Sequence, residues 1–285
     1  MKIAILSGKG GTGKTMLSVN LSVISHSSIY VDCDVEEPNG HLFFELLNQK
    51  KVPVEVDLPK VLSDKCTGCR KCIEFCKFNA LAWVGNKVKV FESICHSCGG
   101  CSIVCPEKAI IEKKKIVGNI LTGEYKDLYV SSGVMNIGEE SGVPIIKALL
   151  KKVDEDNKSL LRDNVIIDCP PGSSCLVSES IKDADYVILV AEPSIFGTQN
   201  LEMVHELVKM SEKPYGCVLN KCEDFENPSE IYCQENGIKI LGKIDNDLEL
   251  ARLTSSGSIL VDESSKFSEL FRAILTRVTF EVNKQ

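Results

Sequence analysis

Residues 2–15 read KIAILSGKGGTGKT, and this stretch decides the fold. Its apolar start, residues 2–6, predicts a buried strand, and residues 15–25 (TMLSVNLSVIS) have the apolar spacing of a helix. The loop between them fits the pattern GxxxxGK[ST], in which glycines permit positive φ and free backbone N–H groups to face an anion. A strand, this loop and a helix in that order predict a phosphate site. A chance glycine-rich turn is the weaker alternative.

The loop supplies most of the candidate nucleotide ligands. Lys14 is expected to contact the β- and γ-phosphates, and the Thr15 hydroxyl is expected to bind Mg²⁺. The phosphate oxygens are expected to be wrapped by the loop residues Gly8, Gly10, Gly11, Thr12, Gly13, Lys14 and Thr15.

Short β-branched runs alternate with helical patterns over most of the 285 residues. Strands are predicted at residues 2–6, 28–33, 127–132, 164–169, 186–191, 215–220 and 238–244. Helices are predicted at residues 15–25, 143–153, 201–211 and 267–278. Such alternation implies right-handed crossovers and an α/β fold with a doubly wound, mostly parallel sheet.

Between about residues 64 and 112 the alternation stops, and eight of the 14 cysteines arrive in two similar halves. Each half has the spacing CxxCxxCxxxC, in which three thiolates hold one 4Fe–4S cluster and the fourth Cys reaches the other cluster. This predicts a first cluster on Cys66, Cys69, Cys72 and Cys105, and a second on Cys95, Cys98, Cys101 and Cys76. Zinc is the alternative, but zinc sites commonly use two CxxC pairs with a longer gap between them.

The repeat is internal to the α/β pattern, so it predicts an inserted domain. We expect a small α+β domain at residues 61–113, within a discontinuous P-loop domain formed by residues 1–60 and 114–285. The cysteine segment resembles a bacterial two-cluster ferredoxin. It departs from that pattern at Lys77, because Pro usually follows the fourth Cys.

Composition limits the setting. The formal net charge is −7, and no long run of one sign indicates nucleic-acid binding. The start of the sequence is unlike a secretory signal, and no stretch reaches the roughly 18 apolar residues of a membrane span. These features predict a cytoplasmic protein without membrane insertion. Because the cytoplasm keeps thiols reduced, its cysteines are expected to serve as metal ligands more often than to form disulfides.

The string KGGTGKT, residues 9–15, resembles the deviant Walker A loop of the MinD/ParA superfamily. That superfamily also contains the nitrogenase iron protein, the arsenite-pump ATPase and Mrp-type iron-sulfur carriers. The resemblance implies ATP as the nucleotide and a nucleotide-sandwich dimer, formed with a second copy or with a similar ATPase. It also implies that Lys9 reaches across the dimer to the nucleotide of the partner subunit.

Three further segments extend the resemblance. VDCDVEEPN (31–39) places Asp32 and Asp34 at the end of a strand beside the phosphate loop. By resemblance Asp34 orients or deprotonates the attacking water, although a role only around the metal is a serious alternative. In VIIDCPPG (165–172) the resemblance implies that Asp168 holds a magnesium-bound water and that Gly172 senses the γ-phosphate.

The segment VLNKC (218–222) resembles the position that reads the base. The Asn220 amide is therefore implied to pair with an adenine edge. GTPases use NKxD, and here Glu223 holds the fourth position, so these letters leave the choice between ATP and GTP open. Family resemblance favours ATP.

Nearly the whole chain resembles MinD-superfamily P-loop ATPases with an inserted ferredoxin domain. The leading hypothesis is a Mg²⁺-dependent ATPase that delivers electrons through two 4Fe–4S clusters to a redox or metal-cofactor partner protein. The alternatives are an iron-sulfur assembly scaffold or carrier, and a MinD-like positioning ATPase.

Three smaller interpretations accompany this hypothesis. Residues 133–142 (GVMNIGEESG) are a candidate coupling or partner-contact loop, or else an ordinary solvated loop. Cys175 is expected to be a buried core residue more readily than a metal ligand. Residues 266–282 are interpreted as a packing helix and not as a membrane-binding helix.

Overall fold

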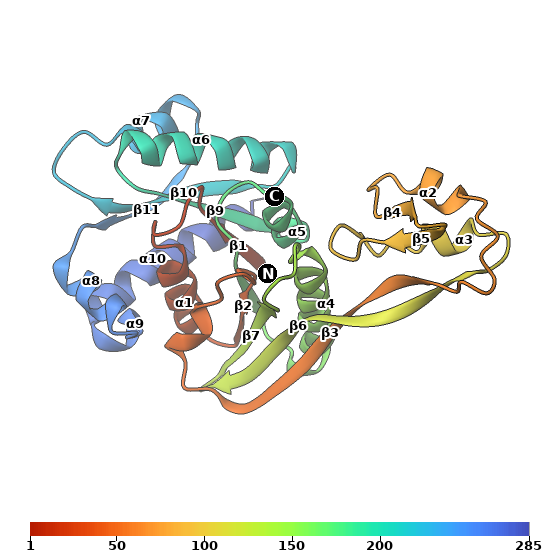
Figure 1. Ribbon diagram of the computed structural model, residues 1–285. Helices are drawn as coiled ribbons and strands as arrows, with labels where there is room; N and C mark the ends of the chain where they lie inside the picture. The colour runs from red at the N-terminus through yellow and green to blue at the C-terminus, as the bar shows by residue number, and fades with distance from the viewer. Residues whose placement is uncertain (285) are drawn as a thin grey trace.

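The larger part of the molecule is built on one nine-stranded sheet. The computed structural model, which describes residues 1–284, gives the strand order β11-β10-β9-β1-β8-β2-β7-β6-β3 (Figure 1). The strands are β1 (Lys2–Leu6), β2 (Ser28–Asp32), β3 (Leu47–Val61), β6 (Ile110–Tyr125), β7 (Leu128–Met135), β8 (Asn164–Asp168), β9 (Tyr186–Ala191), β10 (Tyr215–Cys222) and β11 (Ile240–Asp245). From β11 to β7 all neighbours are parallel, whereas β7, β6 and β3 pair antiparallel.

Helices cover both faces of the parallel part. The helices are α1 (Lys14–Ile24), α4 (Val143–Leu160), α5 (Cys175–Ile181), α6 (Ile195–Met210), α7 (Pro228–Glu235), α8 (Leu248–Ser255), α9 (Leu260–Glu263) and α10 (Ser265–Val282), with a short 3-10 helix η1 (Gly40–Phe43). Apolar residues of α4, α5, α6 and α7 form one core with the sheet, and those of α1, α8, α9 and α10 form another. The predicted doubly wound, mostly parallel fold is confirmed.

Each predicted strand and helix of this part is present. The bounds agree within about four residues, except that α4 extends seven residues past its expected end and α6 begins six residues before its expected start. The continuous apolar runs identified these strands correctly because β1, β2, β8 and β9 are central parallel strands, and such strands are buried on both faces. The interpretation of residues 266–282 as a packing helix is also confirmed, since Phe267, Phe271, Ile274 and Val278 of α10 are buried. Among the described residues, no helix is long and apolar enough to cross a membrane.

The sequence did not predict the ribbon formed by β3 and β6. These strands pair antiparallel from Leu47 opposite Glu124 to Val61 opposite Ile110, and they run out beyond the body of the sheet (Figure 1). Pro53 and Pro59 argue against a central strand, but β3 lies at the edge of the sheet, where a missing N–H is tolerated. The ribbon therefore carries whatever lies between residues 61 and 110 away from the parallel sheet.

A small unit occupies the far end of the ribbon. It contains α2 (Lys71–Phe75), the hairpin of β4 (Leu81–Val84) and β5 (Lys87–Val90), and α3 (Gly100–Ile103). Its buried residues Cys72, Leu81, Val88 and Ile110 form a separate cluster from the cores of the larger part. The unit is thus joined to the sheet mainly through two strands.

Separate cores predict separate stability. Val61 and Ile110 face each other at the end of the ribbon, so an Asn-Gly turn replacing residues 62–109 closes it as a two-residue hairpin. We expect this deletion to leave the thermal unfolding midpoint of the larger part within a few degrees of its value in the full chain, measured by circular dichroism. An unfolded or aggregated deletion variant would contradict the separation of the cores.

Candidate nucleotide and metal sites

The phosphate loop lies between β1 and α1 and lines a cavity of about 570 Å³. Gly11 and Gly13 have φ of +76° and +95°, a conformation that L side chains rarely adopt. At Gly8, a Cβ atom would lie 2.3 Å from the backbone oxygen of Asn200. The cavity is lined by the loop residues Lys9 to Met16, including Thr15, and also by Asp34 and Pro171. These glycines are needed to keep the loop open toward the cavity.

Lys14 is buried against an acidic residue at the end of β8. Its Nζ lies 2.7 Å from Oδ1 of Asp168, and the Tyr30 hydroxyl donates to the other oxygen at 3.0 Å. Burial acts to lower the pKa of Lys14, but the charge and hydrogen bond of Asp168 outweigh it, so this pKa is raised. Lys14 is therefore a fixed cation at the floor of the cavity, and binding a phosphate requires it to share or exchange this carboxylate.

Two aspartates follow β2 and differ in their surroundings. Asp32 is fully buried and accepts hydrogen bonds from the backbone N–H groups of Asp34 (3.1 Å) and Gly40 (3.0 Å). Burial and the nearby Asp168 raise its pKa well above the usual range. Asp34 lines the cavity, and burial raises its pKa to about 6. Asp32 thus braces the turn, whereas Asp34 faces the space where a nucleotide would lie.

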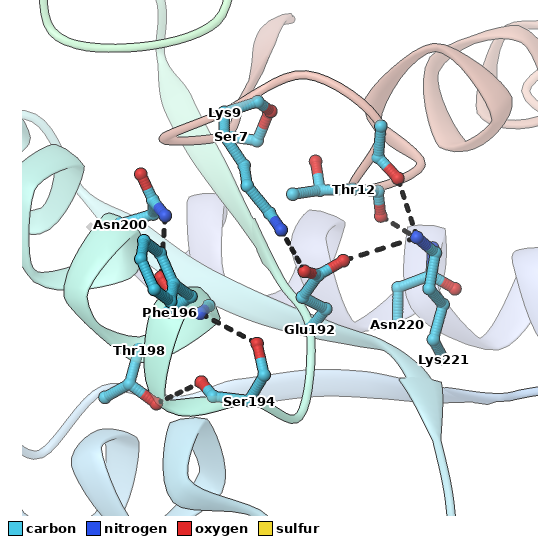
Figure 2. Close-up of polar contacts among 12 residues, drawn as sticks. Ser7, Lys9, Thr12, Glu192, Ser194, Phe196, Thr198, Asn200, Asn220 and Lys221 are labelled. Carbon is cyan, nitrogen blue, oxygen red and sulfur yellow. Dashed lines mark hydrogen bonds and ion pairs between the residues drawn. The ribbon is translucent and has the colours of Figure 1, made fainter.

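The end of β10 holds the phosphate loop from below (Figure 2). The Asn220 amide donates to the backbone oxygen of Thr12 at 2.7 Å, and Lys221 Nζ donates to that of Gly11 at 2.8 Å. Asn220 also lines a neighbouring cavity of about 270 Å³, together with Asp245 to Asp247 and Leu250. Its amide nitrogen already has a partner in this structure, and its pairing with a base stays a prediction.

Lys9 points inward to a carboxylate of its own chain. Lys9 and Lys221 both form ion pairs with Glu192, which follows β9; the Lys221 pair is 3.3 Å long (Figure 2). Although burial works in the opposite direction, the hydrogen bonds donated by these two lysines lower the pKa of Glu192. Sequence reasoning missed Glu192 and Lys221, because no motif links them to the loop. The predicted contact of Lys9 with a partner subunit requires this pair to open.

Gly172 lies four residues after the end of β8 and across from the start of the phosphate loop. Its φ is +91°, and its N–H donates to the backbone oxygen of Ser7 at 2.9 Å. A sensing role for Gly172 stays a prediction, but this bond places its backbone at the edge of the candidate site.

In the small unit, each predicted set of four cysteines lines its own cavity. A cavity of about 420 Å³ is lined by Cys76, Cys95, Cys98 and Cys101, together with Phe75, Phe78 and His96. A much smaller cavity, about 20 Å³, is lined by Cys66, Cys69, Cys72 and Cys105. The fourth Cys of each half thus lies with the first three of the other half.

The two halves also share their backbone geometry. Positive φ occurs at Gly68 and Arg70 in the first half, and at the corresponding Ser97 and Gly99 in the second. The fourth cysteines accept backbone N–H groups in the same way, Cys76 from Ala80 at 3.4 Å and Cys105 from Ala109 at 3.3 Å. Amides directed at sulfur suit thiolates in an iron-sulfur site.

No group of three or more His, Cys, Asp or Glu side chains among residues 1–284 is close enough to hold a single metal ion. Burial raises the pKa of Cys72, and it raises that of Cys101 to about 11. These thiols therefore need the positive charge of a metal in order to ionise. The donor sets fit the 4Fe–4S prediction in number and grouping, and the clusters stay a prediction.

One cysteine prediction is wrong. Cys175 was expected to be buried, but it is exposed at the first turn of α5, three residues after the Pro-Pro-Gly turn that follows β8. The buried residues of α5 are Val177, Ser180 and Ile181, and Cys175 lies on the opposite face of the helix. By contrast, Cys33, Cys169, Cys217 and Cys233 are buried, and Cys222 is half-buried.

The parallel sheet, the glycine loop after β1, and the buried Lys14 facing an acid at the end of β8 define a P-loop nucleotide-binding protein. The chain belongs to the family of the CobQ/CobB/MinD/ParA nucleotide-binding domain, whose model matches residues 3–261. Membership of this family supports an ATPase. The match covers the phosphate loop, the aspartates that follow β2 and β8, and Asn220.

Similar proteins agree with this assignment. An uncharacterized protein of Methanocaldococcus jannaschii is 32% identical over 230 residues, covering 78% of this chain and 80% of that protein. An iron-sulfur cluster carrier protein of Pyrococcus horikoshii is 25% identical over 308 residues, covering 99% and 86%. The structure of the septum site-determining protein MinD of Pyrococcus horikoshii, complexed with Mg-ADP, has the same fold: the TM-score is 0.56, the identity 21% and the coverage 96% and 93%.

The raised pKa of Asp34 gives a pH-dependent prediction. Because its folded-state pKa is about 6 and the usual value is 3.8, ionised Asp34 destabilises the fold fully above pH 6 and not at all below pH 4. Asp34→Asn is therefore expected to raise the thermal unfolding midpoint of nucleotide-free protein at pH 7.5. The gain should vanish as the pH falls toward 4. The replacement of exposed Asp64 by Asn is the control, and a gain that is independent of pH would contradict the assignment.

Proposed function

We propose that this protein hydrolyses Mg-ATP and couples the resulting change of conformation to electron transfer through two 4Fe–4S clusters to a partner protein. The observation that carries the proposal is the joining of two cysteine-lined cavities to a P-loop sheet by a two-stranded ribbon. The composition of each cavity supports the cluster assignment made from spacing, because each contains four cysteines of the predicted set.

In the nucleotide site, the chain supplies binding, charge and a base. The loop N–H groups and Lys14 hold the phosphates, and the Thr15 hydroxyl and Asp168 contribute to the magnesium shell. Asp34, with its pKa of about 6, is suited to orient the attacking water or to accept a proton from it. Lys9 leaves Glu192 and stabilises negative charge on the phosphoryl group of the nucleotide that the partner subunit binds. The partner is a second copy of this chain or a similar ATPase.

In the small unit, the chain supplies thiolates and shields them. When bound, each cluster accepts and releases one electron at a potential that the protein tunes. Cys66, Cys69, Cys72 and Cys105 hold the first cluster, and Cys95, Cys98, Cys101 and Cys76 hold the second. The backbone N–H groups of Ala80 and Ala109 stabilise the negative charge on sulfur. Phe78 and His96 stack at 3.7 Å and cover one side of the second site.

A second candidate is an iron-sulfur carrier, and one specific observation favours it. Cys175 is exposed on α5, which follows the candidate γ-phosphate sensor Gly172, so a copy from each subunit could approach a dimer axis. The similarity to an iron-sulfur cluster carrier protein over 99% of this chain is consistent with it. Two thiolates from two Cys175 residues are too few for a cubane, however, and no further ligand beside them is evident among residues 1–284. Electron transfer is therefore the better-supported function.

The proposal is tested on protein purified without oxygen. We expect about eight iron and eight sulfide atoms per chain, and reduction by dithionite should give the paramagnetic signals of two coupled clusters. Oxidation of the reduced protein by cytochrome c, followed by stopped flow, should change by about fivefold or more when Mg-ATP is added, which is the lower end of typical coupling energies.

The control is Lys9→Ala, which should retain both clusters and lose ATP hydrolysis and the nucleotide effect. Zinc in place of iron, or oxidation rates that ignore nucleotide, would refute the proposal. An additional labile cluster that moves to an apo-ferredoxin, and disappears in Cys175→Ala, would instead establish the carrier.

A further inference from the structure

Val35, the residue after Asp34, is wedged between two glycines of another segment. It is 1% exposed, and its carbonyl accepts a hydrogen bond from the Met135 N–H at 2.9 Å. A Cβ atom added to Gly133 or Gly142 would lie 2.7 Å or 2.4 Å from the Val35 methyl groups. Because the packing is this close, Val35 cannot move without displacing these two glycines. A shift of Asp34 toward a nucleotide must therefore move the segment that these two glycines bound, residues 133–142.

The far side of this segment is attached to the ribbon. The side chain of Asn136 donates to the Ile116 oxygen at 3.1 Å, and Lys115 of β6 donates to Glu139 at 2.9 Å. The Lys115–Glu139 pair is partly buried, with 32% and 17% of the side chains exposed, so it is screened less than an open surface pair. Residues 133–142 thus connect the residue after Asp34 to β6.

The same face of β6 approaches Cys95, one of the cysteines that line the second cavity. Side chains two residues apart on a strand share a face, so Lys113 lies beside Lys115. Lys113 pairs with Glu92 at 3.6 Å, and the Glu92 carbonyl accepts the Cys95 N–H at 3.3 Å. A groove of about 380 Å³ has Cys95, His96 and Ser97 on one side and Glu139, Glu140 and Ser141 on the other. Lys114 points to the opposite face and pairs with Asp57 at 3.5 Å.

The first cysteine cavity is farther along the ribbon. The second cavity is lined by Asp57 and Pro59, whereas the first is lined by Val61, two to four residues farther out, or about 7–13 Å at the rise of a strand. Among the described residues, no salt bridge joins the segment from Cys66 to Cys72 to the larger part of the molecule. The two candidate cluster sites are therefore unequal with respect to the nucleotide site.

We propose that Val35, residues 133–142 and the Lys115–Glu139 pair transmit the nucleotide state to the segment 92–97, so that only the second cysteine site responds to nucleotide. Val35 and Lys115 are positioning residues in this route, since neither contacts the reacting atoms. The inference rests on the proposed function for the identity of the cluster in the second site. The movement of the protein itself can be measured separately.

The experiment is hydrogen–deuterium exchange of the full, cluster-loaded chain with Mg-ADP and with Mg and a non-hydrolysable ATP analogue. Between these states, we expect exchange rates in residues 136–141 and 92–97 to differ by about fivefold or more, and those in residues 66–72 to be unchanged. In Lys115→Met the difference should persist at residues 136–141 and disappear at residues 92–97. The exchanged pair Lys115→Glu with Glu139→Lys should restore it.

Lys126→Met is the matched control, because it removes an ion pair of the same 2.9 Å length, formed with Asp262 just beyond the other end of β6. It should behave as the unmodified protein, and all the variants should hydrolyse ATP at the unmodified rate. The inference is overturned if residues 92–97 show no nucleotide response, if residues 66–72 respond equally, or if Lys115→Met keeps the full response. A loss in Lys126→Met as large as that in Lys115→Met also overturns it. None of these results depends on the rate at which cytochrome c oxidises the reduced protein, and that rate tests the proposed function on its own.

Discussion

The constraint on which the site depends is the burial of charge at the carboxyl ends of the central strands. Lys14, Asp168 and Asp32 lie within the protein where water cannot screen them, and Lys14 and Asp168 form an ion pair of 2.7 Å. Removing one member of such a pair typically costs about 3–5 kcal/mol, because the other is left uncompensated. The same charges prepare the cavity for a phosphate and a magnesium ion, so stability and binding both rest on these residues.

The ribbon gives the inserted unit a defined relation to this site. A flexible linker would leave the two parts independent, whereas paired strands hold their register and transmit displacement along their length. The close packing of Val35 against Gly133 and Gly142 links the residue after Asp34 to residues 133–142, and that segment contacts β6 of the ribbon. The architecture therefore suits a protein in which ATP controls events at one of two cysteine sites. In the single chain Lys9 forms an ion pair with Glu192. On dimer formation it would exchange Glu192 for the nucleotide of the partner subunit.

Much of the fold could be predicted because the central strands and their helices are local features. Continuous apolar runs marked β1, β8 and β9, and helical spacing marked α1, α4 and α10. The antiparallel β3–β6 ribbon was missed, since Pro53 and Pro59 argue against a strand and the two strands are separated by almost fifty positions. Glu192 and Lys221 were missed for a similar reason. Their role comes from three segments that meet in space, and no spacing along the chain records that meeting.

The sequence by itself determined the glycine loop and the two groups of cysteines, because both depend on residue types at short, fixed intervals. Only the tertiary structure decided which carboxylate holds Lys9, that Asp32 braces a turn while Asp34 faces the cavity, and that Cys175 is exposed. It also decided that the second cysteine site, and not the first, lies across a groove from residues 139–141. Such facts depend on distances between segments far apart in the chain, and packing of the whole protein sets those distances.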